Sequence, residues 1–169
     1  MAKHKKADMA YAAGIIDGEG CIQIMHSLLN GHVQSWKVEL DISMCSKKVL
    51  DKMVGLFGGQ AKLYGIRDNQ HYRQWRWQLY SGKAVNALRK MYPYLIEKKA
   101  QAALAINFYN HQKRCKTSRS RPLSLSILAK REKMRSEMKE LKTRDLIPIV
   151  PAETKCENVG NNEAIVHSN

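Results

Sequence analysis

Apolar and polar residues follow two periods along the chain, and each period predicts a different kind of element. Apolar residues at helical spacing predict helices over residues 8–16, 47–57, 83–92, 95–111 and 122–142. Alternation predicts strands over residues 21–29, 33–44, 60–67 and 71–80. Asn30-Gly31 and Asp68-Asn69 are typical hairpin turns, and Gly58-Gly59 is a typical helix stop. The resulting order predicts an α+β domain built on one antiparallel sheet.

The chain divides into three parts by composition. Residues 1–7 are mostly basic and predict a mobile arm, after which Asp8 is the expected N-cap of the first helix. Residues 8–144 carry the periodic patterns and form the expected folded domain, of a length that can bury its own core. Residues 145–169 are polar, contain two prolines and lack periodicity, which is typical of a disordered tail.

Positive charge is concentrated in the first 144 residues. The whole chain has 29 Lys and Arg residues against 15 Asp and Glu residues, a formal net charge of +14. The part up to residue 144 has 28 against 11, a net charge of +17, because residues 145–169 contain a single Lys and four acids. An excess of this size favours a polyanionic partner, such as nucleic acid, or a membrane surface.

Targeting signals and metal-binding patterns are missing from the sequence. No stretch reaches the roughly 18 apolar residues that cross a bilayer, and MAKHKKADM lacks the apolar region of a secretory signal. The four cysteines and six histidines are scattered, which favours reduced thiols over a disulfide framework or a structural zinc site. We therefore expect a location in the cytoplasm of a bacterial or phage-infected cell, or in an organellar matrix, and no secretion or membrane association.

The predicted strands present one polar face. In HYRQWRWQLY the apolar set is Trp75, Trp77 and Leu79, and the alternate residues are polar or aromatic. Arginine pairs with guanine and glutamine with adenine in the DNA major groove, which admits a two-stranded ribbon. A solvated sheet face would show the same alternation, so the charge excess is what favours a DNA-reading surface. Its candidate residues are Gln23, Met25, Ser27, Lys37, Lys62, Arg67, Tyr72, Gln74, Arg76, Gln78 and Tyr80.

Two acidic residues, Glu39 and Asp41, share the polar face of the second predicted strand. They would accept hydrogen bonds from cytosine or pair with the arginines nearby. Alternatively, the assignment of residues to the two faces of this strand is off by one residue. The sequence leaves these three explanations open.

Residues 12–20 read AAGIIDGEG and join the first helix to the first strand. The segment resembles the LAGLIDADG motif of homing endonucleases, with the motif's own residues at Ala13, Gly14, Ile16, Asp17 and Gly20. The order of elements, LFGG after the second helix and the stretch PYLIEKKAQAALAI are also similar to that family, over about residues 8 to 142. The resemblance implies an αββαββα core with a saddle-shaped antiparallel sheet and additional C-terminal helices.

A single copy of the motif implies a homodimer in this family. Ala10, Gly14 and Gly18 lie four residues apart on one helix face, and small residues at this spacing let two helices approach closely. The expected dimer interface consists of these three residues and Asp17. A two-fold axis there would bring both Glu19 carboxylates together, where they repel unless a cation lies between them. The resemblance implies that Glu19 and Gly18 hold Mg²⁺, or Mn²⁺ in its place, and that Asp17 bonds backbone near the helix end.

A basic residue near the scissile phosphate assists catalysis in the family. The matching segment is Glu97–Gln101, where some members carry Lys at the position of Ala100. The role would then fall to Lys98, our preferred choice, or Lys99, unless both only neutralise phosphates. Ser43 stands where the family often has Gln at the end of the second strand, and it could position a water. The resemblance thus implies Glu19, Lys98, Lys99 and Ser43 as catalytic residues.

The expected function is site-specific cleavage of double-stranded DNA. By the resemblance, the dimer would bind a long pseudo-palindromic site and hydrolyse both strands across the minor groove, leaving short 3′ overhangs. The alternative is a non-catalytic DNA- or RNA-binding regulator, or an intron-splicing maturase, on the same fold. Such relatives tend to lose the second motif acid, which is retained here as Glu19. A membrane-surface protein is a third alternative, because residues 122–142 carry an apolar stripe, but that helix lacks Trp and Phe.

Overall fold

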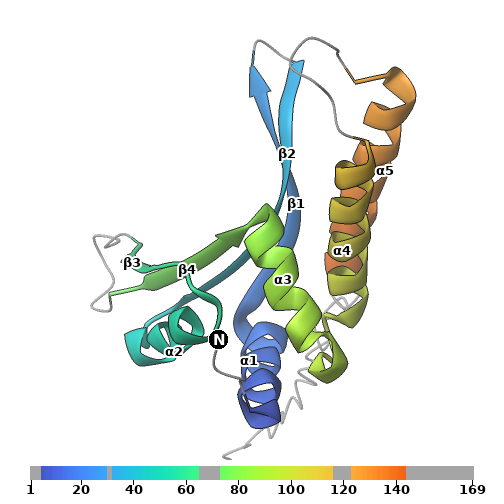
Figure 1. Cartoon of the computed structure of the whole chain (residues 1–169). Helices are drawn as coiled ribbons and strands as arrows, with labels where there is room; N and C mark the ends of the chain where they lie inside the picture. Colours follow the sequence, from blue (N-terminus) through green and yellow to red (C-terminus); the bar gives the residue numbers. More distant parts are fainter. Residues whose placement is uncertain (1–4, 30–31, 65–72, 116–122, 144–169) are drawn as a thin grey trace, which may run out of the picture.

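The computed structural model describes residues 5–29, 32–64, 73–115 and 123–143. Its first half contains the motif helix and a long hairpin (Figure 1). Helix α1 spans Lys6–Glu19 and continues directly into strand β1, Gly20–Leu29, which pairs with strand β2, His32–Met44.

The second half of the fold repeats a helix and a hairpin and then adds helices. Helix α2 spans Lys47–Phe57, and strands β3, Ala61–Leu63, and β4, Trp75–Tyr80, follow it. Helix α3, Ser81–Met91, the short 3-10 helix η1, Tyr92–Tyr94, and helices α4, Lys99–Arg114, and α5, Leu125–Thr143, complete the described chain. The predicted order of helices and hairpins is confirmed.

The strands form one antiparallel sheet in the order β1-β2-β4-β3. The long strand β2 lies in the middle, where Leu40 pairs with Ile22 on one side and with Leu79 on the other. All three side chains are buried on the face that the helices cover, and Trp77 on β4 lies beside Ile42 on the same face. The predicted apolar set of β4 is therefore on the core side, and the predicted α+β class is confirmed.

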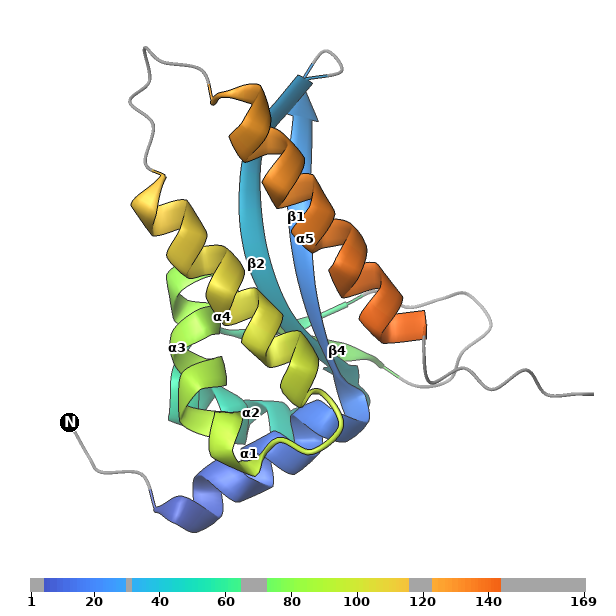
Figure 2. The same cartoon turned by 90° about the vertical axis from the view of Figure 1, so that its right-hand side faces the viewer.

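The helices bury that face of the sheet with small and medium apolar side chains. Ala12, Ala13 and Ile16 of α1 pack there, and so do Leu88 of α3 and Phe108 of α4. Helix α5 lies along α4 and β1 (Figure 2) and contributes Met138, which is 2% exposed. Each fully buried aliphatic side chain of this kind contributes about 1.5–3 kcal/mol of transfer free energy.

Helix α1 is longer at both ends than the apolar period predicts. It begins at Lys6, so the prediction that Asp8 is its N-cap is wrong; Asp8 instead forms an ion pair with Lys52 at 3.2 Å. It ends at Glu19, where the N–H of Gly20 still donates to the carbonyl of Ile16. Both motif acids therefore lie in the last helical turn.

Two other boundaries depend on local chain geometry. Helix α2 ends at Phe57 because Gly58 and Gly59 adopt φ values of +77° and +88°, as the Gly-Gly pair predicts. Helix α4 begins at Lys99 and not at Leu95, because Pro93 lies within η1 and the N–H of Leu95 donates back to Met91.

Several sequence predictions fall outside the described residues. These are the turns Asn30-Gly31 and Asp68-Asn69, the candidate DNA contacts Arg67 and Tyr72, and the tail over 145–169. Among the described helices, none is long and apolar enough to cross a membrane.

Candidate active site and nucleic-acid interface

The small residues of α1 form an exposed stripe. Ala10, Gly14 and Gly18 are exposed, whereas Ala13 and Ile16 on the opposite side of the helix are buried. A Cβ atom added at Gly14 or Gly18 would meet no atom within 4 Å. The fold of one chain therefore has room for larger side chains along this stripe.

Gly20, in contrast, is required by the fold itself. A Cβ atom there would lie 2.8 Å from the Cα of Ile16 and 2.9 Å from its Cδ1. The chain can turn from α1 into β1 within one residue only because this position has no side chain. The exposed Glu19 just before it is consequently held at the junction of helix and sheet.

Asp17 links the end of α1 to the start of α4. Its carboxylate accepts hydrogen bonds from the backbone N–H groups of Ile96 at 2.8 Å and Lys98 at 2.9 Å. A carboxylate at this place also stabilises the positive end of the α4 dipole. The prediction that Asp17 bonds backbone is confirmed, and its place in a subunit interface stays a prediction.

The two candidate lysines of this segment point in different directions. Lys98 is half-buried, and its ammonium group donates to the backbone carbonyl of Asp17 at the end of α1. Lys99 is exposed, and its ammonium lies 5.6 Å from the ring centre of Tyr92. Ala100, where the resemblance would place a basic group, is exposed. Only Lys98 is brought to the motif.

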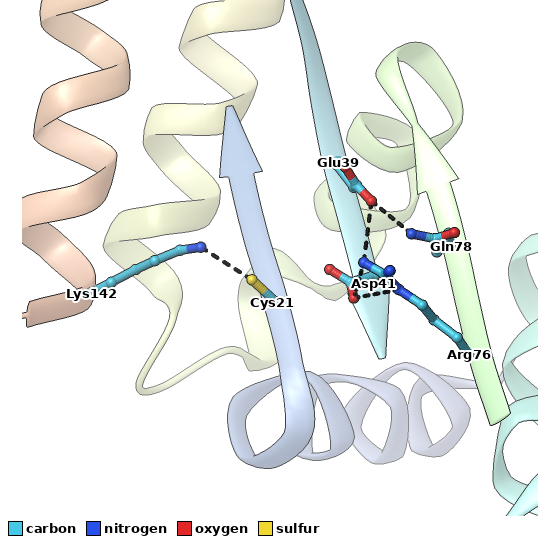
Figure 3. Close-up of polar contacts among 6 residues, drawn as sticks. All are labelled: Cys21, Glu39, Asp41, Arg76, Gln78 and Lys142. Carbon is cyan, nitrogen blue, oxygen red and sulfur yellow. Dashed lines mark hydrogen bonds and ion pairs between the residues drawn. The ribbon is translucent and has the colours of Figure 1, made fainter. Parts of the chain in front are cut away.

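A cavity of about 210 Å³ adjoins the motif and is called the motif cavity here. It contains Lys142 of α5, whose ammonium donates to the thiol sulfur of Cys21 at 3.1 Å (Figure 3). Gln101 is 7% exposed, and its Oε1 has no hydrogen-bond partner among the described residues. Two lysines and one glutamate thus line a small cavity beside the motif. The lining residues are Gly20, Cys21, Glu97, Lys98, Gln101 and Lys142.

Ser43 lies at the same end of the sheet as Glu19. Gly20 pairs with Ile42 across the hairpin, so the residue before Gly20 and the residue after Ile42 leave the β1–β2 ladder at the same place. Ser43 is half-buried and does not line the motif cavity.

The polar sheet face predicted from the sequence is present. Arg76, Gln78 and Tyr80 alternate with the buried Trp77 and Leu79 along β4. On the neighbouring strands, Lys62 pairs with Arg76 and Lys37 pairs with Met25. Further exposed or half-buried members are Gln23, Ser27 and Gln74.

Four side chains in the middle of this face form a hydrogen-bonded network (Figure 3). Arg76 donates to Asp41 from Nε at 3.0 Å and contacts it from Nη2 at 2.9 Å. Its Nη2 also lies 3.5 Å from Glu39, and Gln78 Nε2 donates to Glu39 at 2.7 Å. Of the three explanations for the two acids, pairing with an arginine is therefore the one the structure supports. Both acids lie on the polar face, where Glu39 pairs with Tyr80 and Asp41 with Gln78 across the ladder.

Burial and charge act in opposite directions on this network. Burial would lower the pKa of Arg76, but Asp41 and Glu39 outweigh it, so that the pKa is raised above its ordinary value. Burial and then the charge of Glu39 raise the pKa of the neighbouring Tyr80. Both side chains keep their ordinary charge at neutral pH.

One hollow opens on the polar side of the sheet, and another lies at its β1 edge. The larger one, about 590 Å³, is called the sheet hollow; its lining residues are Gly59, Gln60, Lys62, Leu63, Tyr64, Arg76, Gln78, Tyr80 and Lys83. The smaller one, about 170 Å³, lies between β1 and α5 and brings Gln23 and Met25 next to Arg135 and Lys139. Basic side chains therefore line both hollows.

Sequence reasoning missed the residues that α4 and α5 contribute to the motif cavity, Gln101 and Lys142. Lys142 reaches Cys21 from 121 positions away along the chain, and Gln101 is hidden in an alanine-rich helix. The excess of basic residues in α5 was the one available signal, and it does not indicate which lysine faces the motif.

Comparisons with known proteins agree on the architecture. The archaeal intron-encoded homing endonuclease I-Vdi141I, solved in complex with DNA, superposes with a TM-score of 0.65 at 17% identity, covering 82% of this chain and 86% of that one. The homing endonuclease I-CvuI, solved with DNA in the presence of magnesium, gives 0.64 at 20% identity, covering 80% and 82%. The LAGLIDADG homing endonuclease I-GzeII, also solved with a DNA target, gives 0.61 at 18% identity, covering 95% of this chain and 53% of that one.

Comparisons by sequence find no counterpart. No protein-family model matches the chain, and no curated protein matches it. The structural likeness nonetheless covers 80% or more of this chain in all three comparisons. The chain therefore has the fold of the LAGLIDADG homing endonucleases.

Proposed function

We propose that this chain is a site-specific double-strand DNA endonuclease that acts as a homodimer with a divalent metal. The observation that carries the proposal is the end of α1: Glu19 is exposed there, beside an exposed stripe of small residues and a cavity with two lysines. The fold supports the same activity, because three similar structures are homing endonucleases solved on DNA.

Double-stranded DNA suits the polar sheet face in charge and in chemistry. The chain has a net charge of +14, so binding would release counterions from phosphates and would weaken as salt rises. The side chains of β4 can hydrogen-bond base edges in a major groove. A dimer would present two copies of this face to a long pseudo-palindromic site.

The exposed stripe of α1 supports the homodimer. Ala10, Gly14 and Gly18 leave the helix backbone open to a close neighbour, and no atom of the described chain fills that space at the two glycines. A second copy of α1 packed there about a two-fold axis would place both Glu19 carboxylates near each other.

The oxygen ligands at the end of α1 suit a hard cation only when two copies of the chain form a dimer. No cluster of three metal-ligating side chains occurs within the described residues of one chain. Two Glu19 carboxylates, the carbonyl of Gly18 and DNA phosphates would supply the oxygen ligands that Mg²⁺ prefers, with Mn²⁺ as a substitute. A bound Mg²⁺ would stabilise negative charge on the phosphate and on the leaving oxygen.

The chain's own residues would then position the reacting groups. Lys98 and Lys142, which both line the motif cavity, would hold the scissile phosphate and the nearby water by charge. Ser43 would orient a water from the end of β2, and Lys99, which points away, would neutralise a neighbouring phosphate. Asp17 would keep Lys98 in place through the backbone of the same residue.

A second candidate function is a non-catalytic DNA- or RNA-binding regulator or an intron-splicing maturase. Two features favour it. The Lys98 ammonium already donates a hydrogen bond to the Asp17 carbonyl, and Ala100 has no basic group that could assist catalysis. In that case the polar sheet face binds nucleic acid, and the motif helix only forms the subunit interface of the dimer.

A cleavage selection distinguishes the two candidates. The purified protein is incubated with Mg²⁺ and a DNA library that includes the uninterrupted sequence across its own gene's insertion point. Discrete double-strand cuts with short 3′ overhangs are the expected result. Selective binding without cuts, with Mg²⁺ and with Mn²⁺, would exclude the endonuclease and favour the regulator or maturase.

A further inference from the structure

The orientation of the Gln78 amide is determined by its neighbour Glu39. Gln78 Nε2 donates to Glu39 Oε1 at 2.7 Å. A carboxylate can only accept hydrogen bonds, so the nitrogen of the amide must face it and the oxygen must face away. Figure 3 shows this arrangement, with Gln78 Oε1 on the side of the amide remote from Glu39.

Glu39 is itself held firmly. It is 3% exposed, and Arg76 approaches it at 3.5 Å while donating to Asp41 at 3.0 Å. Asp41 is 6% exposed, so moving either acid would leave a buried charge without its partner. The amide of Gln78 therefore has one favoured orientation.

Gln78 presents its acceptor to a space that a nucleic-acid base could enter. It lines the sheet hollow together with Lys62 and Lys83, whose charges favour phosphates on either side. Arg76 lines the same hollow, but its Nε and Nη2 edge is occupied by Asp41, and the ring of Tyr64 lies 4.9 Å from its guanidinium. The Gln78 oxygen is thus an acceptor in a hollow that also contains the donors of Lys62, Lys83 and Arg76.

We propose that Gln78 selects a base with an exocyclic amino group, adenine or cytosine, at one position of each DNA half-site, and that Glu39 is the positioning residue for this selection. The inference rests on the proposed DNA binding, but not on cleavage. Adenine N6 and cytosine N4 are donors in the major groove, whereas guanine O6 and thymine O4 are acceptors. An acceptor held towards the groove would bind the first pair and repel the second.

The test is a selection of bound DNA from a randomised library, without divalent metal, for the parental chain and for two variants. The parental chain should prefer adenine or cytosine on one strand about tenfold at one position per half-site. Gln78→Leu should lose that preference at this position alone. Glu39→Gln should extend it to guanine and thymine, because an amide at position 39 can donate or accept and lets the Gln78 amide turn over.

Each other outcome contradicts the inference in a distinguishable way. Because every base pair contains one adenine or cytosine, the selected pair is also prepared with an analogue of that base that lacks the exocyclic amino group, which should weaken binding by the parental chain. Unchanged affinity for this analogue would overturn the inference while leaving DNA recognition intact, and so would an unchanged preference in a folded Glu39→Gln variant. No selected sequence with the parental chain would overturn the proposed function as well. If thermal melting reveals that Glu39→Gln is unfolded, the analogue without the amino group, compared between the parental chain and Gln78→Leu, still tests the inference.

Discussion

Lys98 and Asp17 are 81 residues apart in sequence, yet the backbone N–H of Lys98 donates to the Asp17 carboxylate at 2.9 Å. The same carboxylate accepts a hydrogen bond from the backbone N–H of Ile96, and the Lys98 ammonium donates one to the backbone carbonyl of Asp17. The first motif acid thus ties the segment before α4 to the end of α1. This arrangement leaves Glu19 as the motif carboxylate that is free for chemistry.

Removal of the Asp17 carboxylate should destabilise the fold. Asp17→Ala leaves two backbone N–H groups without their acceptor, and we expect a loss of about 1–3 kcal/mol in the free energy of unfolding. Urea denaturation measures it. Asp51→Ala is the matched control, because Asp51 only forms an exposed pair with Lys47 one helical turn away, and should cost at most about 0.5 kcal/mol. Equal losses in the two variants would contradict the anchoring role.

Two glycines of the motif should respond in opposite ways. Gly14→Leu has open space in the single chain, so the fold should persist, but the larger side chain would keep two α1 helices apart. Sedimentation should then detect monomers for this variant and dimers for the parental chain. Gly20→Ala should instead lower the melting temperature, because its Cβ would lie 2.8 Å from Ile16 Cα. A dimeric Gly14→Leu variant would rule out the proposed interface.

Lys142 should affect cleavage more than binding. Lys142→Met removes one of the two ammonium groups of the motif cavity, and we expect the cleavage rate to fall by about tenfold or more. Lys139→Met removes an equal charge one turn earlier in α5, beside Gln23 and Met25, and should weaken binding without a specific effect on rate. The comparison uses single-turnover cleavage at saturating protein. Identical rates for the two variants would exclude Lys142 from the reaction.

Acid should destabilise the protein through His111. Burial, and then the charges of Lys130, Arg131 and Arg114, lower the pKa of His111 below its ordinary value of 6.5. The unfolded chain therefore binds a proton at a higher pH than the folded chain, so stability is full above about pH 6.5 and falls as the pH drops below it. Melting temperatures at about pH 7.5 and pH 5.5 measure the effect. His111→Gln should lose less stability over this interval, and an undiminished loss would refute this origin.

Local patterns accounted for most of the fold. Alternation placed Trp77 and Leu79 in the core and Arg76 and Gln78 on the open face, because the two faces of a strand follow directly from its period. Element boundaries were less predictable where distant residues decide them. Pro93 and η1 separate Leu95 from α4, and the N–H groups just before α4 donate to Asp17 of α1, which no pattern near Leu95 indicates.

The candidate site was predictable only in part, for the same physical reason. The motif predicted Asp17 and Glu19 as site residues, and the alternation along β4 predicted Gln78, since each residue is part of a local pattern. The position of Lys142 beside Cys21 depends on how α5 packs against β1 and α4. The pairing of Arg76 with both Glu39 and Asp41 required the strand register, which the sequence left open.

The most direct test of the account is the comparison of the parental chain with Glu19→Gln on a selected DNA site in Mg²⁺. The variant keeps the size of the side chain and removes the charge that would hold the metal. We expect double-strand cleavage by the parental chain and none by Glu19→Gln, with affinity for the site retained within about tenfold, because the phosphate contacts remain. Cleavage by Glu19→Gln at the parental rate would contradict the metal-binding role of Glu19.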